Sequence, residues 1–393
     1  MKFRYSESVP KRTDNPTAAI LKAAADPQVI SFGGGLPAPE LFPVAEMKAA
    51  CDRVFDHNGQ QVLQYAETLG YPKLRRQIVD MMQKRGVQTD VPNVAVVTGS
   101  QQAIDLVGRM LINPGDIVLT EDPTYLAAID VFKTYGAHLV GVEMDEAGMR
   151  PEALAQALER YPETKFIYTI PNFQNPTGRT MTADRRAQIV KLAAQAQVPL
   201  VEDDPYGAIR YAGTNLPPLK HYDQDGTVIS ISSFSKILAP GLRMGWLVAE
   251  QSFMEKFVQL KQNADLHTDN LTQYIVADFL DNVDLDQHIK KITDVYRHRA
   301  ELMLSQIDQY FPASVRHSQP EGGMFIWVEV PGTDADELLK VCLKNNVAFV
   351  PGSAFFAGKV QPGTFRLNFS NMDDEQIRTG IQRMAKAIQT VLA

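Results

Sequence analysis

Cysteine and histidine are too few, or too widely spaced, for disulfide or metal chemistry in this chain of 393 residues. The two cysteines, Cys51 and Cys342, lie far apart, so they cannot form a disulfide framework or a four-cysteine zinc site, and they fit a reducing cytoplasm. The seven histidines never recur at H-x-x-x-H spacing, and neither cysteine has a CxxC partner. A metalloenzyme is therefore not expected.

Long apolar runs and clusters of basic residues are also missing. No apolar stretch approaches the ~20 residues of a membrane-spanning helix, and the N-terminus carries early charges without the apolar core of a signal peptide. Acidic residues outnumber Lys and Arg by 46 to 39, which gives a net charge of −7. An acidic chain without a basic cluster argues against nucleic-acid and anionic-membrane partners.

Enough apolar sequence is present for a large core. Hydrophobic residues make up 45% of the chain and charged residues 22%, ordinary globular values that exclude wholesale disorder. The length predicts two or three domains, or one large α/β domain with a smaller satellite. The chain contains no internal repeat and no low-complexity tract.

The middle of the chain alternates short apolar segments with helical patterns. The segments expected to be strands are 94–99, 117–123, 138–145, 165–171, 198–204, 227–233 and 244–249. Helical periodicity at 151–160 and 182–196 lies between them. Short, fully apolar strands that alternate with helices predict a buried, mainly parallel sheet and an α/β fold.

The last third of the chain has a different pattern. Helix is expected from about 269 to 309, followed by three short strands and a helix at 373–391, which together describe a smaller α+β unit. We therefore predict three parts. Residues 1–42 form an N-terminal arm that returns to join the small domain, 43–285 form the large domain, and 286–393 form the small domain.

The segment SSFSKILAPGLRMGW places Lys236 in a loop of small hydroxyl residues. A lysine amine that is held near a carbonyl and kept partly uncharged forms a Schiff base. Ser233, Ser235 and Arg243 would surround a phosphate with hydroxyl donors and one fixed cation. A surface lysine in a serine-rich loop is the alternative for this motif taken alone.

Two further segments are candidates for binding anionic groups. Ser100 and Gln101 open a helix directly after an apolar strand, and the free N–H groups and positive end of a helix attract an anion. A simple serine N-cap is the alternative. Asn175 precedes a proline in PNFQNPTG and can donate its amide to a phenolate-type oxygen, unless the motif is an ordinary Asn-Pro turn.

Charged and aromatic residues near other expected strands are candidates too, each with a structural alternative. Asp203 ends an apolar strand with Tyr206 three residues later, which suits either a half-buried acid beside a cation or a capping Asp-Asp pair. Tyr125 either stacks on a planar ring or belongs to the core. Arg366 lies in an apolar strand and either clamps a carboxylate or faces water from an edge strand.

Taken together, these motifs resemble the class I/II, fold-type I aminotransferases, which use pyridoxal 5′-phosphate. The resemblance extends over residues 29–390 and is strongest to the 2-aminoadipate/kynurenine aminotransferase-like group. It rests on ten collinear motifs: GGGLPAPELFP, QYAETLGYPKLR, TGSQQA, EDPTY, NFQNPTG, EDDPY, SSFSK–PGLRMGW, EGGMFIW, VPGSAFF and FRLNFS. It implies a large pyridoxal-phosphate-binding domain with a mainly parallel, seven-stranded type of sheet, and a smaller α+β domain.

The resemblance also implies roles for individual residues. Lys236 would carry the internal aldimine and then move the proton between the substrate Cα and the cofactor. Asp203 would pair with the pyridine nitrogen, and Tyr206 and Asn175 would bind the ring 3′-oxygen. The other implied cofactor contacts are Tyr125 on the ring face and Ser100, Gln101, Ser233, Ser235 and Arg243 on the phosphate.

Substrate and partner contacts follow from the same resemblance. Arg366 would clamp the substrate α-carboxylate, assisted by the backbone of Gly35 and by the Asn175 amide. Tyr65 would reach the phosphate of a neighbouring subunit, so a homodimer with shared sites is expected.

The N-terminal arm departs from the family pattern. Many relatives carry an arginine in the arm, where Ala18 stands here, although Arg12 lies slightly upstream. Recognition of acidic side chains by the arm is therefore in doubt, which favours an aromatic or aliphatic amino donor over 2-aminoadipate.

The expected function is transfer of the amino group of an L-amino acid to a 2-oxo acid such as 2-oxoglutarate, in ping-pong fashion. A pyridoxal-phosphate β-lyase or decarboxylase is an alternative, because the same residues labilise other bonds at Cα. A non-catalytic ligand-sensing domain is a third, but it would need an N-terminal helix-turn-helix, and only about 28 residues precede the first expected strand.

Overall fold

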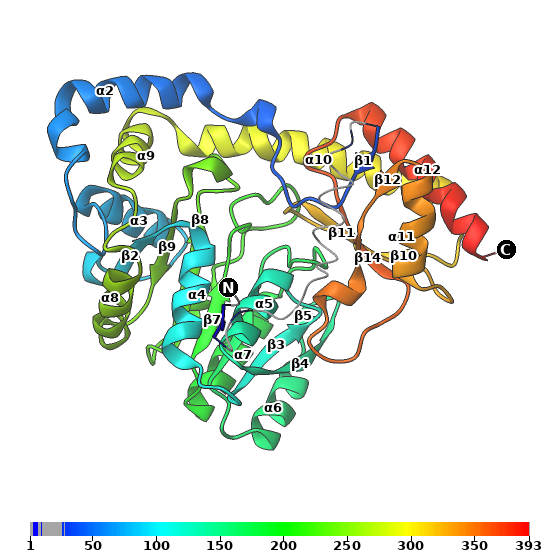
Figure 1. The fold of residues 1–393 in the computed structure, drawn as a ribbon, viewed down its shortest axis with the longest axis horizontal. Coiled ribbons are helices and arrows are strands. Elements are labelled where there is room, and N and C mark those ends of the chain that lie inside the picture. Colours follow the sequence, from blue (N-terminus) through cyan, green and yellow to red (C-terminus); the bar gives the residue numbers. More distant parts are fainter. Residues whose placement is uncertain (1–2, 7–8, 10–25, 27, 393) are drawn as a thin grey trace.

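A computed structural model of the chain describes residues 3–6, 9, 26 and 28–392. A large α/β unit with an eight-stranded sheet lies beside a smaller unit with a four-stranded sheet (Figure 1). The prediction of an α/β fold with a mainly parallel sheet and a smaller α+β unit is confirmed. The domain limits at 42/43 and 285/286 remain a prediction.

The central sheet has the strand order β2-β9-β8-β7-β6-β3-β4-β5. Its strands are β2 (Val94–Val97), β3 (Ile117–Asp122), β4 (His138–Asp145), β5 (Gly148–Met149), β6 (Phe166–Thr169), β7 (Leu200–Asp203), β8 (Val228–Ser233) and β9 (Gly245–Val248). The pairs among β4, β3, β6, β7 and β8 are all parallel, whereas β9 is antiparallel to β2 and β8. The eighth strand, beyond the expected seven, is the two-residue β5, antiparallel to β4.

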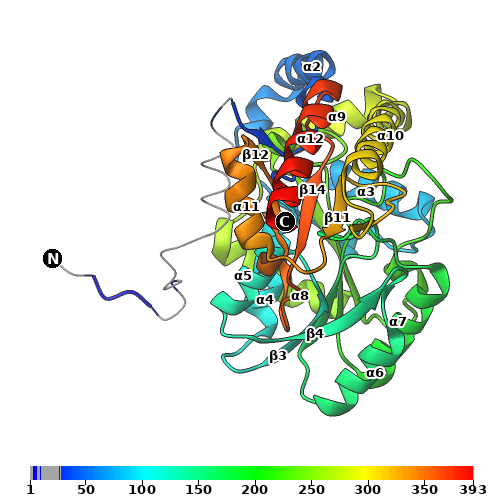
Figure 2. The ribbon, with the colours of Figure 1, turned by 90° about the vertical axis from the view of Figure 1, so that its right-hand side faces the viewer.

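Both faces of this sheet are covered by helices and are buried. Alternate residues of each strand point to opposite faces, so each strand contributes side chains to both layers of the core. Ile167 packs in the cluster that includes α6 and α7, while Phe166 and Tyr168 pack in the cluster on the other face. Figure 2 shows α6 and α7 on one side of the sheet and α4 and α5 on the other. These helices are α4 (Gly99–Leu111), α5 (Leu126–Thr134), α6 (Pro151–Arg160) and α7 (Ala183–Ala196).

The remaining helices of the large unit flank the sheet at its β2 edge. They are α2 (Val44–Val62), α3 (Pro72–Lys84), α8 (Gln251–Asp265) and α9 (Asn270–Asn282). α2 packs on α9, and α3 packs on both α9 and β2. Short 3-10 helices occur at η1 (Pro39–Leu41), η2 (Val91–Asn93), η3 (Leu219–Tyr222), η4 (Pro240–Leu242) and η5 (Gly352–Phe355).

The helical stretch expected from 269 to 309 is two helices, α9 and α10 (Leu285–Tyr310). The chain is extended at Val283, and the side chain of Asp284 accepts a hydrogen bond from the Gln287 N–H. An aspartate N-cap begins a new helix at this point. Periodicity alone did not reveal this break, because apolar residues continue across it.

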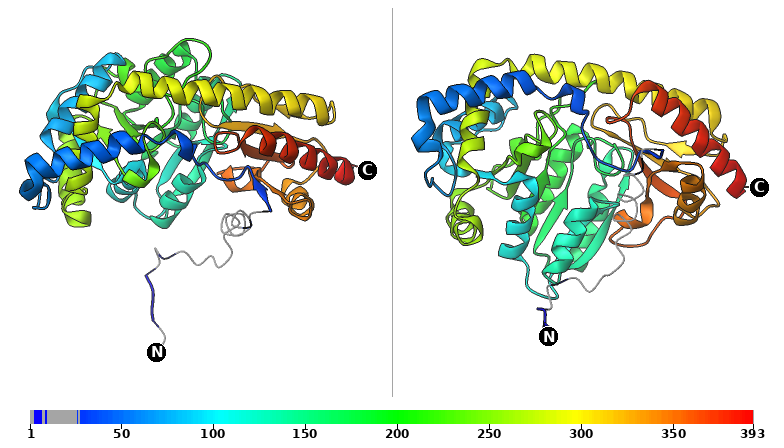
Figure 3. Two further views of the ribbon diagram at one scale, coloured as in Figure 1. Left: turned by 90° about the horizontal axis from the view of Figure 1, so that it is seen from above. Right: turned by 45° about the horizontal axis from the view of Figure 1, so that its top comes forward.

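The small unit contains an antiparallel sheet and three long helices. The sheet order is β10 (Arg316–His317), β11 (Phe325–Glu329), β14 (Thr364–Asn368) and β13 (Val350–Pro351). The helices are α10, α11 (Ala335–Lys344) and α12 (Asp374–Leu392), and α10 packs against α12 (Figure 3). The N-terminal strand β1 (Ile30–Ser31) pairs in parallel with β12 (Val347–Ala348), so the chain before α2 is bonded to the small unit.

Candidate functional site

A cavity of about 360 Å³ lies where the small unit meets the central sheet. Its walls include every predicted site residue except Tyr65: Gly35, Ser100, Gln101, Tyr125, Asn175, Asp203, Tyr206, Ser233, Ser235, Lys236, Arg243 and Arg366. Many of them follow the carboxyl ends of β3, β6, β7 and β8. Those ends meet at one edge of a parallel sheet, which is the usual position of a ligand site in such folds.

One end of the cavity suits an anion. Ser100 and Gln101 lie in the first turn of α4, and the Ser233 hydroxyl donates to Ser235 Oγ at 2.8 Å. Gly99 has a positive φ of 71°, and a Cβ there would lie 2.5 Å from Arg243 Nη2. The guanidinium therefore lies against the start of the helix, where free N–H groups and a cation act on the same space.

The Lys236 amine lines the cavity and donates to the Gly35 carbonyl at 2.8 Å. Burial, together with the nearby Arg366 and Arg243 cations, lowers the pKa of Lys236 to about 8. At pH 7 about a tenth of this amine is therefore neutral, far more than for a lysine in water. A neutral, held amine is the form that attacks a carbonyl.

Asp203 is an acid that forms no ion pair within the described residues. It is buried, and one carboxylate oxygen, Oδ2, accepts from the Tyr168 hydroxyl at 2.6 Å. The other oxygen, Oδ1, has no hydrogen-bond partner among the described residues. Burial raises the pKa of Asp203 to about 7, even though the Tyr168 hydrogen bond lowers it. A buried acceptor on the cavity wall fits a protonated ring nitrogen of a bound group.

Arg366 is the cationic group at the other end of the cavity. Its Nη1 donates to Asn175 Oδ1 and its Nη2 to the Gly33 carbonyl, both at 2.7 Å, while Nε lacks a partner in the described part of the chain. The guanidinium lies between the rings of Phe325 and Phe355, 4.4 and 5.0 Å from their centroids. Burial lowers the pKa of Arg366 to about 10, so it stays charged and can bind a carboxylate.

Two backbone carbonyls near the cavity accept from its cations. Gly35 lines the cavity and its carbonyl accepts from Lys236, and the Gly33 carbonyl accepts from Arg366. The expected contact of the Gly35 backbone with a substrate carboxylate stays a prediction. Tyr206 packs edge-on against Phe325, and burial raises its pKa. Burial likewise raises the pKa of Tyr125, so both phenols stay protonated.

Tyr65 does not join this group. Its side chain is 78% exposed and contacts only the edge of the His267 ring among the described aromatic pairs. Its expected role in a neighbouring subunit stays a prediction. The arm positions Ala18 and Arg12 lie outside the described residues.

Several supporting residues were not predicted. Gln174 donates to Glu121 Oε2 at 3.1 Å and to the Pro123 carbonyl at 2.8 Å, and its Oε1 accepts from Thr177. It thereby joins the loop of Asn175 to the loop that leads to Tyr125.

Tyr168 was predicted only as part of an apolar strand. Its hydroxyl was a usable signal, because a hydroxyl in a fully buried strand needs a hydrogen-bond partner.

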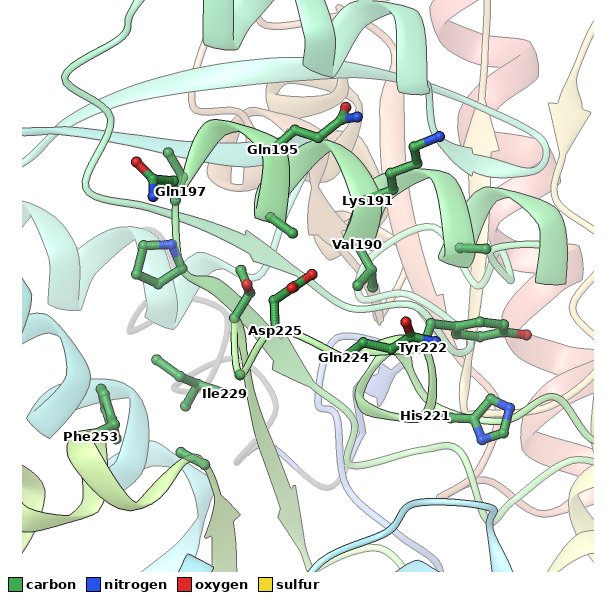
Figure 4. Close-up of a pocket in the computed structure, with 17 residues that line it drawn as sticks. Val190, Lys191, Gln195, Gln197, His221, Tyr222, Gln224, Asp225, Ile229 and Phe253 are labelled. Atoms are coloured by element: carbon green, nitrogen blue, oxygen red, sulfur yellow. The ribbon is translucent and has the colours of Figure 1, made fainter.

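A second, larger cavity of about 1220 Å³ lies at the opposite, amino-terminal ends of β7 and β8. It is an open groove formed by α7, η3, the loop after η3 and the start of α8 (Figure 4). Its charged side chains, among them Lys191 and Asp225, lie apart along the groove (Figure 4). No group of three or more metal-binding side chains occurs in the described residues, and no helix there is long and apolar enough to cross a membrane.

Comparisons with known proteins agree on one family. The sequence pattern described as "Aminotransferase class I and II" matches residues 28–384. The chain is 42% identical over 379 residues to aromatic-amino-acid aminotransferase 1 of Thermococcus litoralis, covering 94% of this chain and 90% of that protein. It is 39% identical over 378 residues to 2-aminoadipate transaminase of Thermus thermophilus, covering 95% and 94%.

A solved structure gives the same result. The Pyrococcus horikoshii kynurenine aminotransferase, solved in complex with PMP, kynurenine and its product, matches with a TM-score of 0.95 and 37% identity. The match covers 99% of this chain and 98% of that one.

Proposed function

This chain belongs to the class I and II aminotransferases and is a pyridoxal-phosphate-dependent enzyme. From that premise we propose that it moves the amino group of an aromatic, aliphatic or 2-aminoadipate-like L-amino acid to a 2-oxo acid such as 2-oxoglutarate. The observation that carries the proposal is that one cavity holds both Lys236, a partly buried amine of lowered pKa, and Arg366, a buried arginine.

The cavity residues fit pyridoxal phosphate. When bound, the cofactor's protonated ring acts as an electron sink for the carbanion formed at the substrate Cα. Asp203 Oδ1 would accept from the ring nitrogen, and this buried, unpartnered oxygen is the main support for the fit. Asn175 and Tyr206 would hold the ring oxygen, and Tyr125 would cover a ring face. The phosphate would be held by Ser100, Gln101, Ser233, Ser235 and Arg243.

Lys236 would take the proton from the Cα of the amino acid and pass it to the cofactor, and in the second half-reaction it would carry a proton from the cofactor to the Cα of the new amino acid. Its lowered pKa supports this role, because a general base works best when its pKa lies near the working pH. Arg366 would bind the α-carboxylate of the amino acid and then of the 2-oxo acid. One clamp can serve both half-reactions, because both substrates carry that carboxylate at the same distance from the reacting carbon.

The side-chain class of the donor is proposed from the relatives and from the apolar wall of the cavity. Leu126, Ile170 and Phe325 line it together with Tyr125. An aromatic or aliphatic side chain would remove this surface from water, whereas a second carboxylate would need a further cation.

The working enzyme would be a cytoplasmic homodimer. Phe55, Leu63, Tyr65 and Leu266 are large apolar side chains that are about half exposed or more, and Tyr65 contacts His267, next to Leu266. Such a group of exposed apolar residues favours burial against a second copy. The proposed dimer brings Tyr65 to the partner's phosphate site.

The proposed cytoplasmic location is supported by the free cysteines, Cys51 and Cys342, which fit a reducing compartment.

A single-turnover screen tests the proposal. The cofactor-loaded enzyme is mixed with each common amino acid, and its absorbance is followed as pyridoxal phosphate becomes pyridoxamine phosphate. Aromatic donors should convert fastest, and 2-oxoglutarate should restore the starting spectrum. Conversion by no amino acid, or release of pyruvate and ammonia without an acceptor, would contradict amino transfer.

A further inference from the structure

We propose that Tyr168 is a positioning residue for Asp203. Its hydroxyl holds one carboxylate oxygen and keeps the group ionised, so that the other oxygen is presented to the ring nitrogen of the cofactor. This inference rests on the proposed role of Asp203 and adds a residue that touches neither cofactor nor substrate.

The backbone directs the two side chains to each other. Tyr168 on β6 is the parallel partner of Val201 on β7, so Asp203 lies two residues farther along β7 on the same face of the sheet. The Tyr168 ring is fully buried and meets the ring of Phe132 edge-on, with centroids 5.5 Å apart. Held in this way, the phenol has little rotational freedom, and its hydroxyl reaches Asp203 Oδ2 at 2.6 Å.

Asp203 depends on this hydroxyl more than its neighbours depend on any single donor. Asp204 is paired with Arg85 and also accepts from Asn172 and from the Gly207 N–H. Glu202 accepts from two backbone N–H groups, at Leu219 and Lys220. For the Asp203 side chain, the phenol of Tyr168 is the one hydrogen-bond donor within the described residues.

The surroundings of Asp203 otherwise favour its neutral form. The titratable groups that act on it are Tyr125, Tyr168, Glu202, Asp204 and Tyr206. Two of them are neighbouring carboxylates, Glu202 within β7 and Asp204 directly after it, and burial removes water from all three acids. The Tyr168 hydrogen bond acts in the opposite direction, because a donor to a carboxylate stabilises the ionised acid.

Loss of the hydroxyl should therefore have a pH-dependent effect on cofactor affinity. Without the donor the pKa of Asp203 rises, and near pH 7 a smaller fraction of the carboxyl is ionised and able to pair with a protonated ring nitrogen. At alkaline pH the carboxyl ionises even without the donor, so the difference from the wild type shrinks.

The test is the affinity of the full-length apoenzyme for pyridoxamine 5′-phosphate, which forms no bond with Lys236. Tyr168→Phe should bind it about tenfold more weakly at pH 7, the usual worth of a hydrogen bond to a charged group. At pH 9 the affinities of Tyr168→Phe and the wild type for pyridoxamine 5′-phosphate should differ by less than they do at pH 7. The matched control is Tyr135→Phe, which removes a phenol that donates to Asp105 at 2.9 Å outside the cavity. Its affinity should equal that of the wild type at both pH values.

Equal affinity of Tyr168→Phe and wild type at pH 7 would overturn the inference. A weakening that is the same at pH 7 and pH 9 would also overturn it, because the hydroxyl would then act on shape alone and not on charge.

A double-mutant cycle separates this inference from the proposed function. Asp203→Asn should weaken binding, and Tyr168→Phe should add less than about twofold in that background. If Asp203→Asn binds as the wild type does, the proposed role of Asp203 fails. If Asp203→Asn weakens binding while Tyr168→Phe does not, only the role of Tyr168 fails.

The cycle also covers a folding defect. If Tyr168→Phe fails to fold because Asp203 is left without a donor, the double variant should fold, and this rescue would support the pairing. If both Tyr168→Phe and the double variant fail to fold while Tyr135→Phe folds, the Tyr168 hydroxyl is purely structural and the inference is overturned.

Discussion

The two ends of the cavity are built in different ways. The end around Asp203 and Arg243 comes from the carboxyl edge of the central sheet and the first turn of α4, within the large unit. The end around Arg366 joins three distant segments, since its partners Asn175 and Gly33 lie 191 and 333 residues away in sequence. The first end is formed by the sheet itself, whereas the second exists only when the small unit and the chain before α2 are docked on the large unit. Cofactor binding and substrate binding should therefore be separable by mutation.

The largest effect is expected at the residue between the two ends. Lys236→Ala should lower turnover at least about 10³-fold, because both the nucleophilic amine and the proton carrier are lost. The cofactor should still bind through the sheet end, but with the absorbance of free pyridoxal phosphate. Turnover and the spectrum of the loaded variant are the measurements.

Lys220→Ala is the matched control for Lys236→Ala. It removes a buried lysine that is paired with Asp223 outside the cavity, and it should reduce stability without abolishing turnover. Wild-type transamination by Lys236→Ala would refute the assignment of Lys236.

Arg366→Gln should affect the substrate end alone. We expect kcat/KM for amino acids to fall about hundredfold, from the loss of charged hydrogen bonds to the carboxylate. Affinity for pyridoxamine phosphate should stay within about threefold of wild type. Arg75→Gln is the control, since Arg75 is also a buried arginine that donates to backbone carbonyls. Loss of cofactor affinity in Arg366→Gln as large as the loss in kcat/KM would show that the two ends are not separable.

Gly99→Ala should affect the sheet end alone. A Cβ at a φ of 71° is strained, and it would lie 2.5 Å from Arg243 Nη2 and displace the guanidinium. Cofactor affinity should fall about tenfold, with little change in the KM for the amino acid. Gly115→Ala has a similar positive φ of 92° but no atom within 4 Å of the added Cβ in the described part of the chain. Equal losses of cofactor affinity in the two variants would remove the role of Arg243.

The smallest effect concerns pH and tests whether the ends influence each other. The rate at which the apoenzyme reacts with pyridoxal phosphate should rise about fivefold between pH 7 and 8 and about twofold more by pH 9, and then level off. The reason is that the neutral fraction of Lys236 grows as pH rises through its pKa of about 8. In Arg366→Gln this profile should move to higher pH, because a cation that lowers the pKa of Lys236 is gone. An unchanged profile would mean that Arg366 does not contribute to the lowered pKa of Lys236.

Prediction from the sequence was most reliable for features that depend on neighbouring residues in the chain. The apolar strands, the helix patterns between them and the glycine and proline motifs are local signals, and the predicted fold class is confirmed by the topology. The break between α9 and α10 was missed because it depends on a single capping residue, Asp284, inside a continuous apolar pattern.

The candidate site was identified from motifs in their order along the chain, and the predicted residues except Tyr65 do line one cavity. Their partners could not be read in the same way. The contact of Arg366 with the Gly33 carbonyl and the contact of Gln174 with the Pro123 carbonyl both depend on which backbone groups face each other after folding.

By itself, the sequence determined the class of fold and the family, through its alternating apolar segments and its collinear motifs. It also singled out Lys236 as the amine proposed to do the chemistry. Only the tertiary structure decided the electrostatics. It placed Arg366 beside two aromatic rings, lowered the pKa of Lys236 by burial, and left one oxygen of Asp203 unpartnered while Tyr168 holds the other. The physical reason is that apolar patterning is a local property of the chain, whereas burial and charge–charge distances are set by residues that folding brings together from far apart.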